Sequence, residues 1–202
     1  MTSFFGNTAI FTVEANRERL GKSLFMLKYV KIPDIVTLCS LLVAIMSIYF
    51  SLEGKYNLAL GLLPLSAFLD CLDGFTARLI QRQGNFGKEL DLLVDLVAFG
   101  VTLTVFWLAT SQRTIIDILV VMIYLTANAL RLAALSIRPV DEPNKGVPDD
   151  VNAVAFSIAY FLGLRQLFPV MFVIGAILML LPIRVPRIRL QLEYGKITIK
   201  ID

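Results

Sequence analysis

The sequence contains no histidine among its 202 residues, so imidazole takes no part in any mechanism that it supports. Serine–histidine–aspartate triads, cysteine–histidine pairs and histidine metal sites are therefore excluded. The two cysteines, Cys39 and Cys71, cannot form a CxxC pair, and each lies in an apolar segment where a small buried residue is the usual role. Acid–base chemistry must therefore fall to carboxylates, lysines or tyrosines.

Charge is also scarce, at 17% of residues, while 57% are hydrophobic and the mean hydropathy is +0.75. This composition excludes an ordinary soluble globular protein and predicts a polytopic membrane protein. The first thirty residues do not resemble a typical secretory signal. The charged residues Glu14, Arg17, Glu18, Arg19 and Lys22 interrupt any apolar stretch that could serve as the core of such a signal. The net charge of +3 adds little, and nothing indicates nucleic-acid binding.

The long apolar runs predict an all-α bundle with six transmembrane helices. The predicted spans are 35–51, 58–80, 92–110, 114–136, 151–164 and 167–182. Before them, residues 17–31 place leucines on one face and basic residues elsewhere, which predicts an amphipathic helix on an anionic membrane surface. A helix docked on the bundle is the alternative.

The tail "RIRLQLEYGKITIKID" alternates apolar and polar residues around a Tyr-Gly turn, which predicts a short β-hairpin. We expect this hairpin to pack on the bundle, the membrane or a second subunit, because an isolated hairpin is marginally stable. The predicted parts are a cytoplasmic segment over 1–34, a membrane domain over 35–182 and a cytoplasmic tail over 183–202.

Basic residues gather in alternate connections between the predicted spans. Cytoplasmic loops carry the excess of lysine and arginine, so both termini and the segment between the second and third spans are predicted to be cytoplasmic. The same alternation favours an even number of spans.

The segment "FLDCLDGFTARLIQRQGNFGKELDLLVD" carries four aspartates between two apolar runs. They are Asp70, Asp73, Asp91 and Asp95. At helical spacing the first two share a face of one helix and the last two share a face of the next. Four facing carboxylates repel one another unless cations neutralise them. All-oxygen ligation suits hard divalent cations such as Mg²⁺, Mn²⁺ or Ca²⁺.

Small residues and an arginine accompany the acids: Gly74, Ala77 and Arg78. Glycine and alanine permit close approach of a ligand, although helix packing explains small residues in membranes equally well. Arginine binds phosphate oxygens. Together these residues favour a diphosphate substrate, and the membrane setting favours one that carries lipid tails.

Two other readings compete with this metal site. The aspartates could be satisfied ion pairs with Arg78, Arg82 and Lys88, at the cost of keeping charges in an apolar bundle. A cation or proton transporter is the rival from another class, but transporters hold their acids near the midplane. Here Asp91 is predicted to open the third span, which favours a site open to the cytoplasm.

The four aspartates, the two small residues, the arginine and one further residue, Gly87, make eight positions. Together they follow the spacing D-x2-D-G-x2-A-R-x8-G-x3-D-x3-D. This pattern resembles the signature of the CDP-alcohol phosphotransferases at every position. The resemblance implies a six-helix enzyme with two divalent cations, Mg²⁺ or Mn²⁺, that transfers the lipid phosphate of a CDP-linked substrate to an alcohol and releases CMP. It implies that Asp70, Asp73 and Asp91 are the principal metal ligands. Asp95 would contact the second metal and act as the base for the acceptor hydroxyl.

The resemblance also implies a CDP pocket lined by Gly74, Ala77 and Arg78. Upstream, "IPDIVT" resembles the family's entrance to the first helix, which would place Asp34 and Thr37 near the nucleotide. Many relatives have asparagine at the position of Asp34. Homodimers are common in the family, so a homodimer is a further expectation.

The run "LVAFGV" after the last aspartate resembles the serine-transferring branch, as do "ALRLAAL" and "KGVP". The sequence departs from that branch at Ala98 and at Asp149-Asp150. Serine is therefore the favoured acceptor, with CDP-diacylglycerol as the donor. Inositol phosphate, glycerol phosphate, choline and an archaeal-type lipid remain alternatives. Arg131 is the predicted cation for the serine carboxylate, or else a lipid-diphosphate ligand or a membrane anchor.

Overall fold

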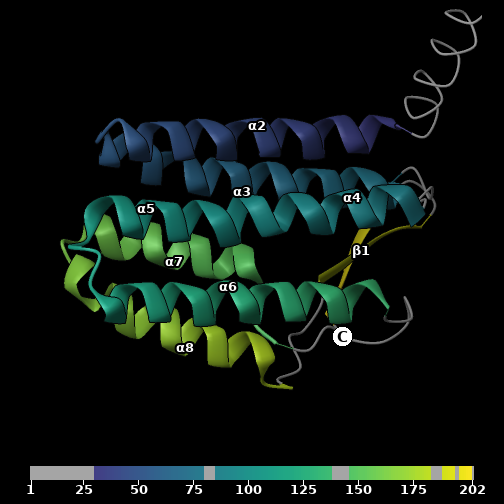
Figure 1. The fold of residues 1–202 in the computed structure, drawn as a ribbon. Helices are drawn as coiled ribbons and strands as arrows, with labels where there is room; N and C mark the ends of the chain where they lie inside the picture. Colours follow the sequence, from purple (N-terminus) through teal and green to yellow (C-terminus); the bar gives the residue numbers. More distant parts are fainter. Residues whose placement is uncertain (1–29, 80–84, 138–145, 183–187, 194–195, 202) are drawn as a thin grey trace, which may run out of the picture. The chain divides into compact units, whose positions relative to one another are not determined.

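The computed structural model describes residues 30–79, 85–137, 146–182, 188–193 and 196–201. Its helical bundle lies within the compact unit Pro33–Asp202 (Figure 1). The helices are α2 (Ile32–Leu52), α3 (Tyr56–Leu79), α4 (Asn85–Asp95), the π-helix η2 (Leu96–Val101), α5 (Thr102–Thr110), α6 (Ile115–Ser136), α7 (Asp149–Phe161), the 3-10 turn η3 (Arg165–Leu167) and α8 (Phe168–Leu180). The amphipathic helix predicted over 17–31 lies almost entirely outside the described residues.

Within the described part of the chain, four helices are long and apolar enough to cross a membrane. They are Pro33–Leu52, Tyr56–Gly74, Phe86–Thr110 and Ile115–Ser136. The protein is therefore a multi-pass membrane protein. The predicted fifth and sixth spans correspond to α7 and α8, which have 13 residues each. At about 1.5 Å per residue they are shorter than a bilayer core of about 30 Å requires.

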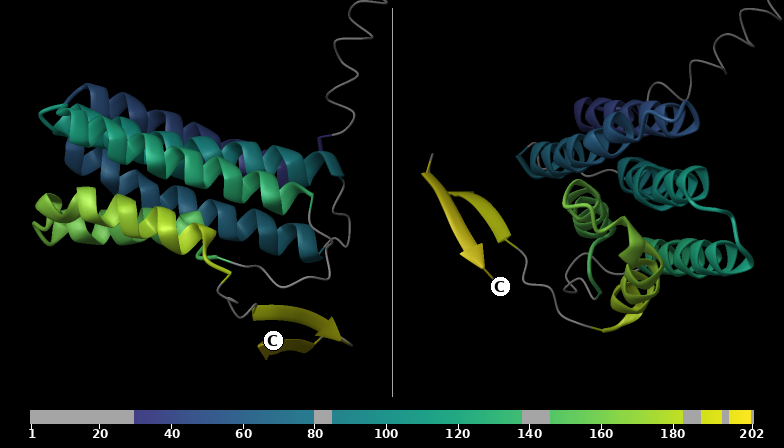
Figure 2. Two further views of the ribbon diagram at one scale, coloured as in Figure 1. Left: turned by 60° about the horizontal axis from the view of Figure 1, so that its bottom comes forward. Right: turned by 90° about the vertical axis from the view of Figure 1, so that its left-hand side faces the viewer.

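Serine hydroxyls join α2 to α3, which lie side by side (Figure 2). Ser40 and Ser66 lie 2.9 Å apart, hydroxyl to hydroxyl, and Ser47 donates to the carbonyl of Ala59 at 2.7 Å. Small side chains let two apolar helices approach closely, and a hydroxyl inside a membrane needs a partner. This pairing fixes α3, which carries the first two aspartates.

Aromatic side chains from α5, α7, η3–α8 and α6 form the centre of the bundle. Phe156 and Phe172 have ring centroids 4.5 Å apart, and Tyr124 packs edge-on against Phe172 at 4.9 Å. Trp107 donates its indole N–H to Asp117, which also caps the start of α6. Such rings contribute both area and specific geometry, so they hold α6, α7 and α8 in a defined arrangement.

The third span begins earlier than predicted. Instead of starting at residue 92, α4 begins at Asn85 and continues through η2 into α5. Its first turns are polar on one side, so a hydropathy pattern assigned them to the connection. Asp91 therefore lies inside a helix rather than at its start. The π-helix was not predicted either: Thr102 donates both its backbone N–H and its hydroxyl to the carbonyl of Val97.

Strands β1 (Ile188–Glu193) and β2 (Lys196–Ile201) pair antiparallel, from Ile188 opposite Ile201 to Glu193 opposite Lys196. The Tyr-Gly turn between them lies outside the described residues. The expected packing of this pair on the bundle, the membrane or a second subunit stays a prediction.

Candidate active site

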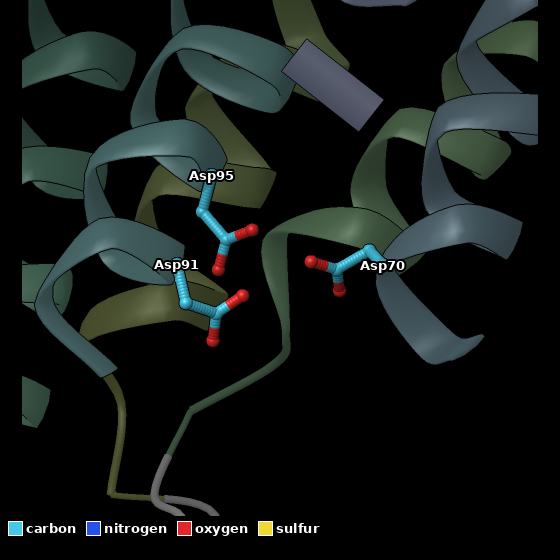
Figure 3. Close-up of side chains that lie close together, drawn as sticks. All are labelled: Asp70, Asp91 and Asp95. Atoms are coloured by element: carbon cyan, nitrogen blue, oxygen red, sulfur yellow. The ribbon is translucent and has the colours of Figure 1, made fainter. Parts of the chain in front are cut away.

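Three of the four aspartates point at one another from two helices (Figure 3). Asp70 comes from α3, while Asp91 and Asp95 come from successive turns of α4. One carboxylate oxygen from each of the three lies within 4.8 Å of the others. The helical spacing of the sequence thus brings together acids that are separated by the α3–α4 connection.

This carboxylate cluster is chemically incomplete without a cation or protons. Asp70 and Asp95 lie within hydrogen-bonding reach of each other. Two ionised carboxylates repel each other at such a distance unless a proton or a cation lies between them. Among the described residues, the buried Oδ1 atoms of Asp91 and Asp95 have no hydrogen-bond partner. An all-oxygen donor set of this kind fits Mg²⁺, Mn²⁺ or Ca²⁺. The residues present therefore fit a divalent-metal site.

Asp73 lies one turn further along α3 and outside the cluster of three oxygens. It is 4% exposed and lies near Thr37 and Asp34 of α2. Its Oδ2 has no hydrogen-bond partner within the part of the chain that the structure describes. The structure thus places Asp73 next to the predicted nucleotide-side residues of α2 and leaves one oxygen for a further ligand.

A glycine brings α4 against α2 at this point. A Cβ atom added to Gly87 would lie 2.7 Å from Oδ1 of Asp34. Asp34 and Thr37 are both buried near the start of α2, and Thr37 donates to the carbonyl of Pro33 at 3.3 Å. Gly87 is therefore required by close approach of two helices rather than by a turn.

The other predicted nucleotide-side residues lie on the last turns of α3. Gly74 is half-buried directly after Asp73. Ala77 and Arg78 follow on the same helix, and their side chains lie outside the described part of the structure.

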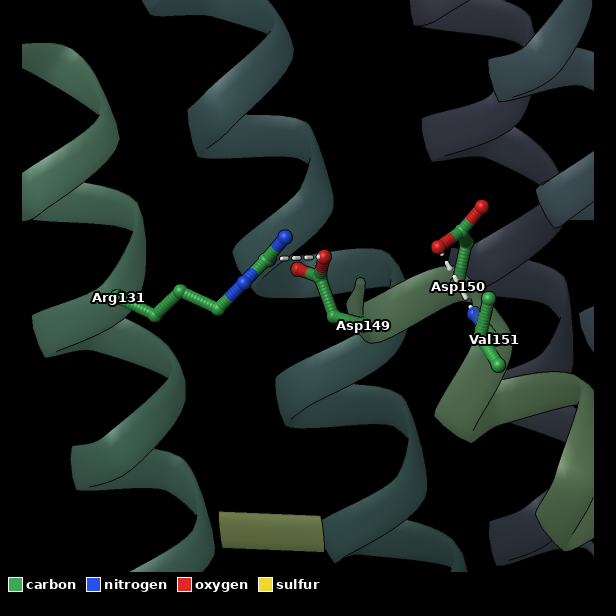
Figure 4. A network of polar contacts seen from close by, with 4 residues as sticks. All are labelled: Arg131, Asp149, Asp150 and Val151. Atoms are coloured by element: carbon green, nitrogen blue, oxygen red, sulfur yellow. Dashed lines mark hydrogen bonds and ion pairs between the residues drawn. The ribbon is translucent and has the colours of Figure 1, made fainter. Parts of the chain in front are cut away.

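Arg131 has a partner that the sequence did not predict. It reaches from α6 to Asp149 at the start of α7, and Nη1 lies 2.5 Å from Oδ1 (Figure 4). Both side chains are 5% exposed. The neighbouring Asp150 instead accepts a hydrogen bond from the backbone N–H of Val151 at 2.8 Å. The unexpected Asp149-Asp150 pair thus has two different roles.

Sequence reasoning missed three buried polar residues near this ion pair. Tyr124 and Asn128 are 0% exposed on α6, and Asn152 is 8% exposed on α7. The spacing of Tyr124, Asn128 and Arg131 along one face of an apolar helix was the available signal. This signal was overlooked because a single tyrosine, asparagine or arginine in an apolar helix does not by itself indicate a polar face.

The fold and the cluster together define a class: a multi-pass helical membrane protein with a half-buried carboxylate site suited to divalent cations, formed where α3 faces α4. A family model described as CDP-alcohol phosphatidyltransferase matches residues 30–184. The chain therefore belongs to the CDP-alcohol phosphatidyltransferase family, which confirms the resemblance seen in the aspartate motif.

Relatives with serine-specific names are found in bacteria and archaea. The CDP-diacylglycerol–serine O-phosphatidyltransferase of Mycobacterium tuberculosis (strain ATCC 25618 / H37Rv) is 31% identical over 134 residues, which cover 66% of this chain and 44% of that protein. An archaetidylserine synthase of Methanothermobacter thermautotrophicus is 30% identical over 166 residues, or 79% and 71% of the two chains. A Helicobacter pylori (strain J99) CDP-diacylglycerol–serine O-phosphatidyltransferase is 34% identical over 108 residues, or 52% and 45%. The chain thus spans less than half the length of these two bacterial relatives.

Proposed function

We propose that the protein transfers the phosphatidyl group of CDP-diacylglycerol to the hydroxyl of a small alcohol, foremost L-serine, and releases CMP. The observation that carries this proposal is the convergence of Asp70, Asp91 and Asp95 within 4.8 Å on the two helices that hold the family motif. The serine-specific names of relatives at about 30% identity support the choice of acceptor.

The reaction is a displacement at phosphorus. The acceptor oxygen forms a bond to the phosphorus that carries the diacylglycerol ester, and the bond from that phosphorus to the CMP oxygen breaks. CMP leaves with the electron pair, and the hydroxyl proton passes to the carboxylate of Asp95. Two divalent cations, Mg²⁺ or Mn²⁺, held by Asp70, Asp73, Asp91 and Asp95, would neutralise the diphosphate and the departing CMP. Without histidine, a carboxylate is the base on offer.

The remaining motif residues are proposed to position the donor. Gly74, Ala77 and Arg78 would line the CDP pocket from α3. Asp34 and Thr37 would approach the nucleotide from α2, which is consistent with their closeness to Asp73. Arg131 would serve the acceptor rather than the donor.

The positive-inside pattern supports a cell-membrane location with both termini and the site on the cytoplasmic side. In this arrangement α7 and α8 complete a six-helix membrane domain over 35–182, flanked by cytoplasmic segments. A homodimer remains part of the proposal.

The deciding experiment incubates the purified protein with CDP-diacylglycerol, Mn²⁺ or Mg²⁺ and a panel of labelled alcohols, and measures CMP release and the lipid formed. We expect release only with an acceptor and a divalent cation. Asp70→Asn should abolish it, whereas Glu53→Gln, an exposed acid at the α2–α3 turn, should not. Absence of CMP release with every acceptor, together with metal-dependent ion flux into liposomes, would establish the transporter instead.

A further inference from the structure

A polar face runs along α6 and meets the first turn of α7 inside the bundle. Tyr124, Asn128 and Arg131 follow one another at spacings of four and three on α6. Asp149 and Asn152 are three apart on α7. All five are buried, with exposures between 0% and 8%. Polar residues in a membrane bundle are costly, so their concentration along one face needs an explanation.

Most of these side chains retain unused hydrogen-bonding capacity. The atoms without a partner among the described residues are Arg131 Nε, Asp149 Oδ2, Asn152 Nδ2, the Tyr124 hydroxyl, and both Oδ1 and Nδ2 of Asn128. Each such buried atom costs about 1–3 kcal/mol if it stays unsatisfied. Six such atoms in one region of the bundle offer donors and acceptors to a polar molecule bound beside them.

Two glycines lie against these amides, and the first of them leaves no space for a side chain. A Cβ at Gly100 of η2 would lie 2.9 Å from Nδ2 of Asn128. A Cβ at Gly175 of α8 would lie 3.5 Å from Nδ2 of Asn152. The polar face is thus bordered by η2 and α8 as well as by its own two helices.

The polar face adjoins the carboxylate cluster on the side of the proposed base. The charge of Asp149 acts on Asp95, and also on Asp70 and Asp91. Arg131 and Asp149 neutralise each other, so the region offers one cation and one anion rather than net positive charge. An acceptor that already carries a phosphate would find little compensation there, whereas a zwitterion finds a complement to each of its charges.

We propose that Arg131, Asp149, Asn128 and Asn152 form the acceptor subsite and that it selects a small alcohol bearing both an ammonium and a carboxylate group. The ammonium would donate to Oδ2 of Asp149 and to Oδ1 of Asn128. The carboxylate would accept from Nε of Arg131 and from the amide of Asn152. This inference rests on the proposed transferase function and adds to it the residue, Asp149, that recognises the amine.

The test compares acceptors that differ by one group: L-serine, 3-hydroxypropanoate, which lacks the ammonium, ethanolamine, which lacks the carboxylate, and glycerol 3-phosphate. Asp149→Asn should raise the apparent KM for serine at least about tenfold and leave that for CDP-diacylglycerol unchanged, because one charge-assisted hydrogen bond is lost. The preference for serine over 3-hydroxypropanoate should fall by about the same factor. Asp150→Asn removes an adjacent carboxylate and should leave the serine KM unchanged.

Removing Asp149 alone leaves the Arg131 charge buried, so a second variant guards against misfolding. The double variant Arg131→Gln/Asp149→Asn removes both charges and leaves neither partner unpaired, so its Tm should stay close to that of the wild type while discrimination among serine, 3-hydroxypropanoate and ethanolamine is lost. An unchanged serine preference in both variants would overturn the acceptor subsite and leave the transferase function standing. So would a wild-type preference for glycerol 3-phosphate. If wild type releases no CMP with any acceptor, the proposed function itself fails.

Discussion

The substitution Gly87→Ala tests how closely α4 must approach α2 for the site to form. The added Cβ would lie 2.7 Å from Oδ1 of Asp34, closer than the 3.0 Å below which real Cβ contacts essentially never occur. Ordinary contact begins at 3.4 Å. Asp34 is 5% exposed and cannot simply turn into solvent. Either the Asp34 carboxylate must rotate within its buried surroundings or the start of α4 must shift away from α2 by about half an ångström or more.

The shift should affect activity more than stability. Overpacking costs about 1–3 kcal/mol, but alanine is favoured over glycine in a helix by about 1 kcal/mol, so the two effects largely offset each other. Asp91 lies one turn after Gly87 on the same helix, so the displacement reaches the carboxylate cluster. Misplacement of catalytic groups by about 1 Å can cost a factor of about 100, and we expect kcat/KM to fall about ten- to a hundredfold.

The assay is CMP release from CDP-diacylglycerol, with thermal unfolding followed in parallel. Gly61→Ala is the matched control. In the described part of the chain, a Cβ added at Gly61 would meet no neighbouring atom within 4 Å. It should leave both activity and Tm close to wild type. Full activity in Gly87→Ala at an unchanged Tm would refute the steric reasoning, since the two helices would then have room to spare.

Three further predictions concern the charged groups. Arg131→Met should lower the free energy of unfolding by about 3–5 kcal/mol, because it leaves the buried charge of Asp149 unpaired. The double variant Arg131→Met/Asp149→Leu should recover most of this loss in a denaturant titration. Equal losses in both variants would mean that the unpaired charge does not cause the destabilisation. Asp70→Asn and Asp91→Asn should weaken Mn²⁺ binding, measured by calorimetry, together with activity, whereas Asp95→Asn should reduce kcat most and preserve the substrate complex; wild-type kcat in the Asp95 variant rules out its role as base. Arg131→Lys should raise KM for serine alone in steady-state assays, and a change confined to the CDP-diacylglycerol KM would instead assign Arg131 to the diphosphate.

The sequence predicted the helices through long apolar runs and the carboxylate cluster through spacing that repeats at helical periodicity. Both signals are local, so they survive without knowledge of the tertiary fold. The early start of α4 was missed because its first turns are polar on one side, as the "NFGKE" run shows. The Arg131–Asp149 pair was missed for a different reason. Which of several charges on separate helices meet depends on how those helices pack, and no local pattern encodes that.

The structure also shows why only three of the four predicted ligands form the cluster, while Asp73 lies beside it. Asp70 and Asp73 share a helical face, but Asp73 lies further toward α2, near Thr37 and Asp34. Sequence spacing predicts which side chains share a face of one helix. Which of them meet side chains of another helix depends on how the two helices cross.

The π-helix between α4 and α5 has a consequence for how this family member can change over time. A π-turn holds one residue more than an α-turn, and such turns arise as single-residue insertions in an ordinary helix. Here the π-helix Leu96–Val101 lies between the half that carries Asp91 and Asp95 and the half that carries Trp107. A length change there alters the relative phase of the two halves without breaking either. Loss of one residue there would therefore rotate the aspartates relative to the aromatic core, and it would be expected to disturb the metal site before it disturbed the fold.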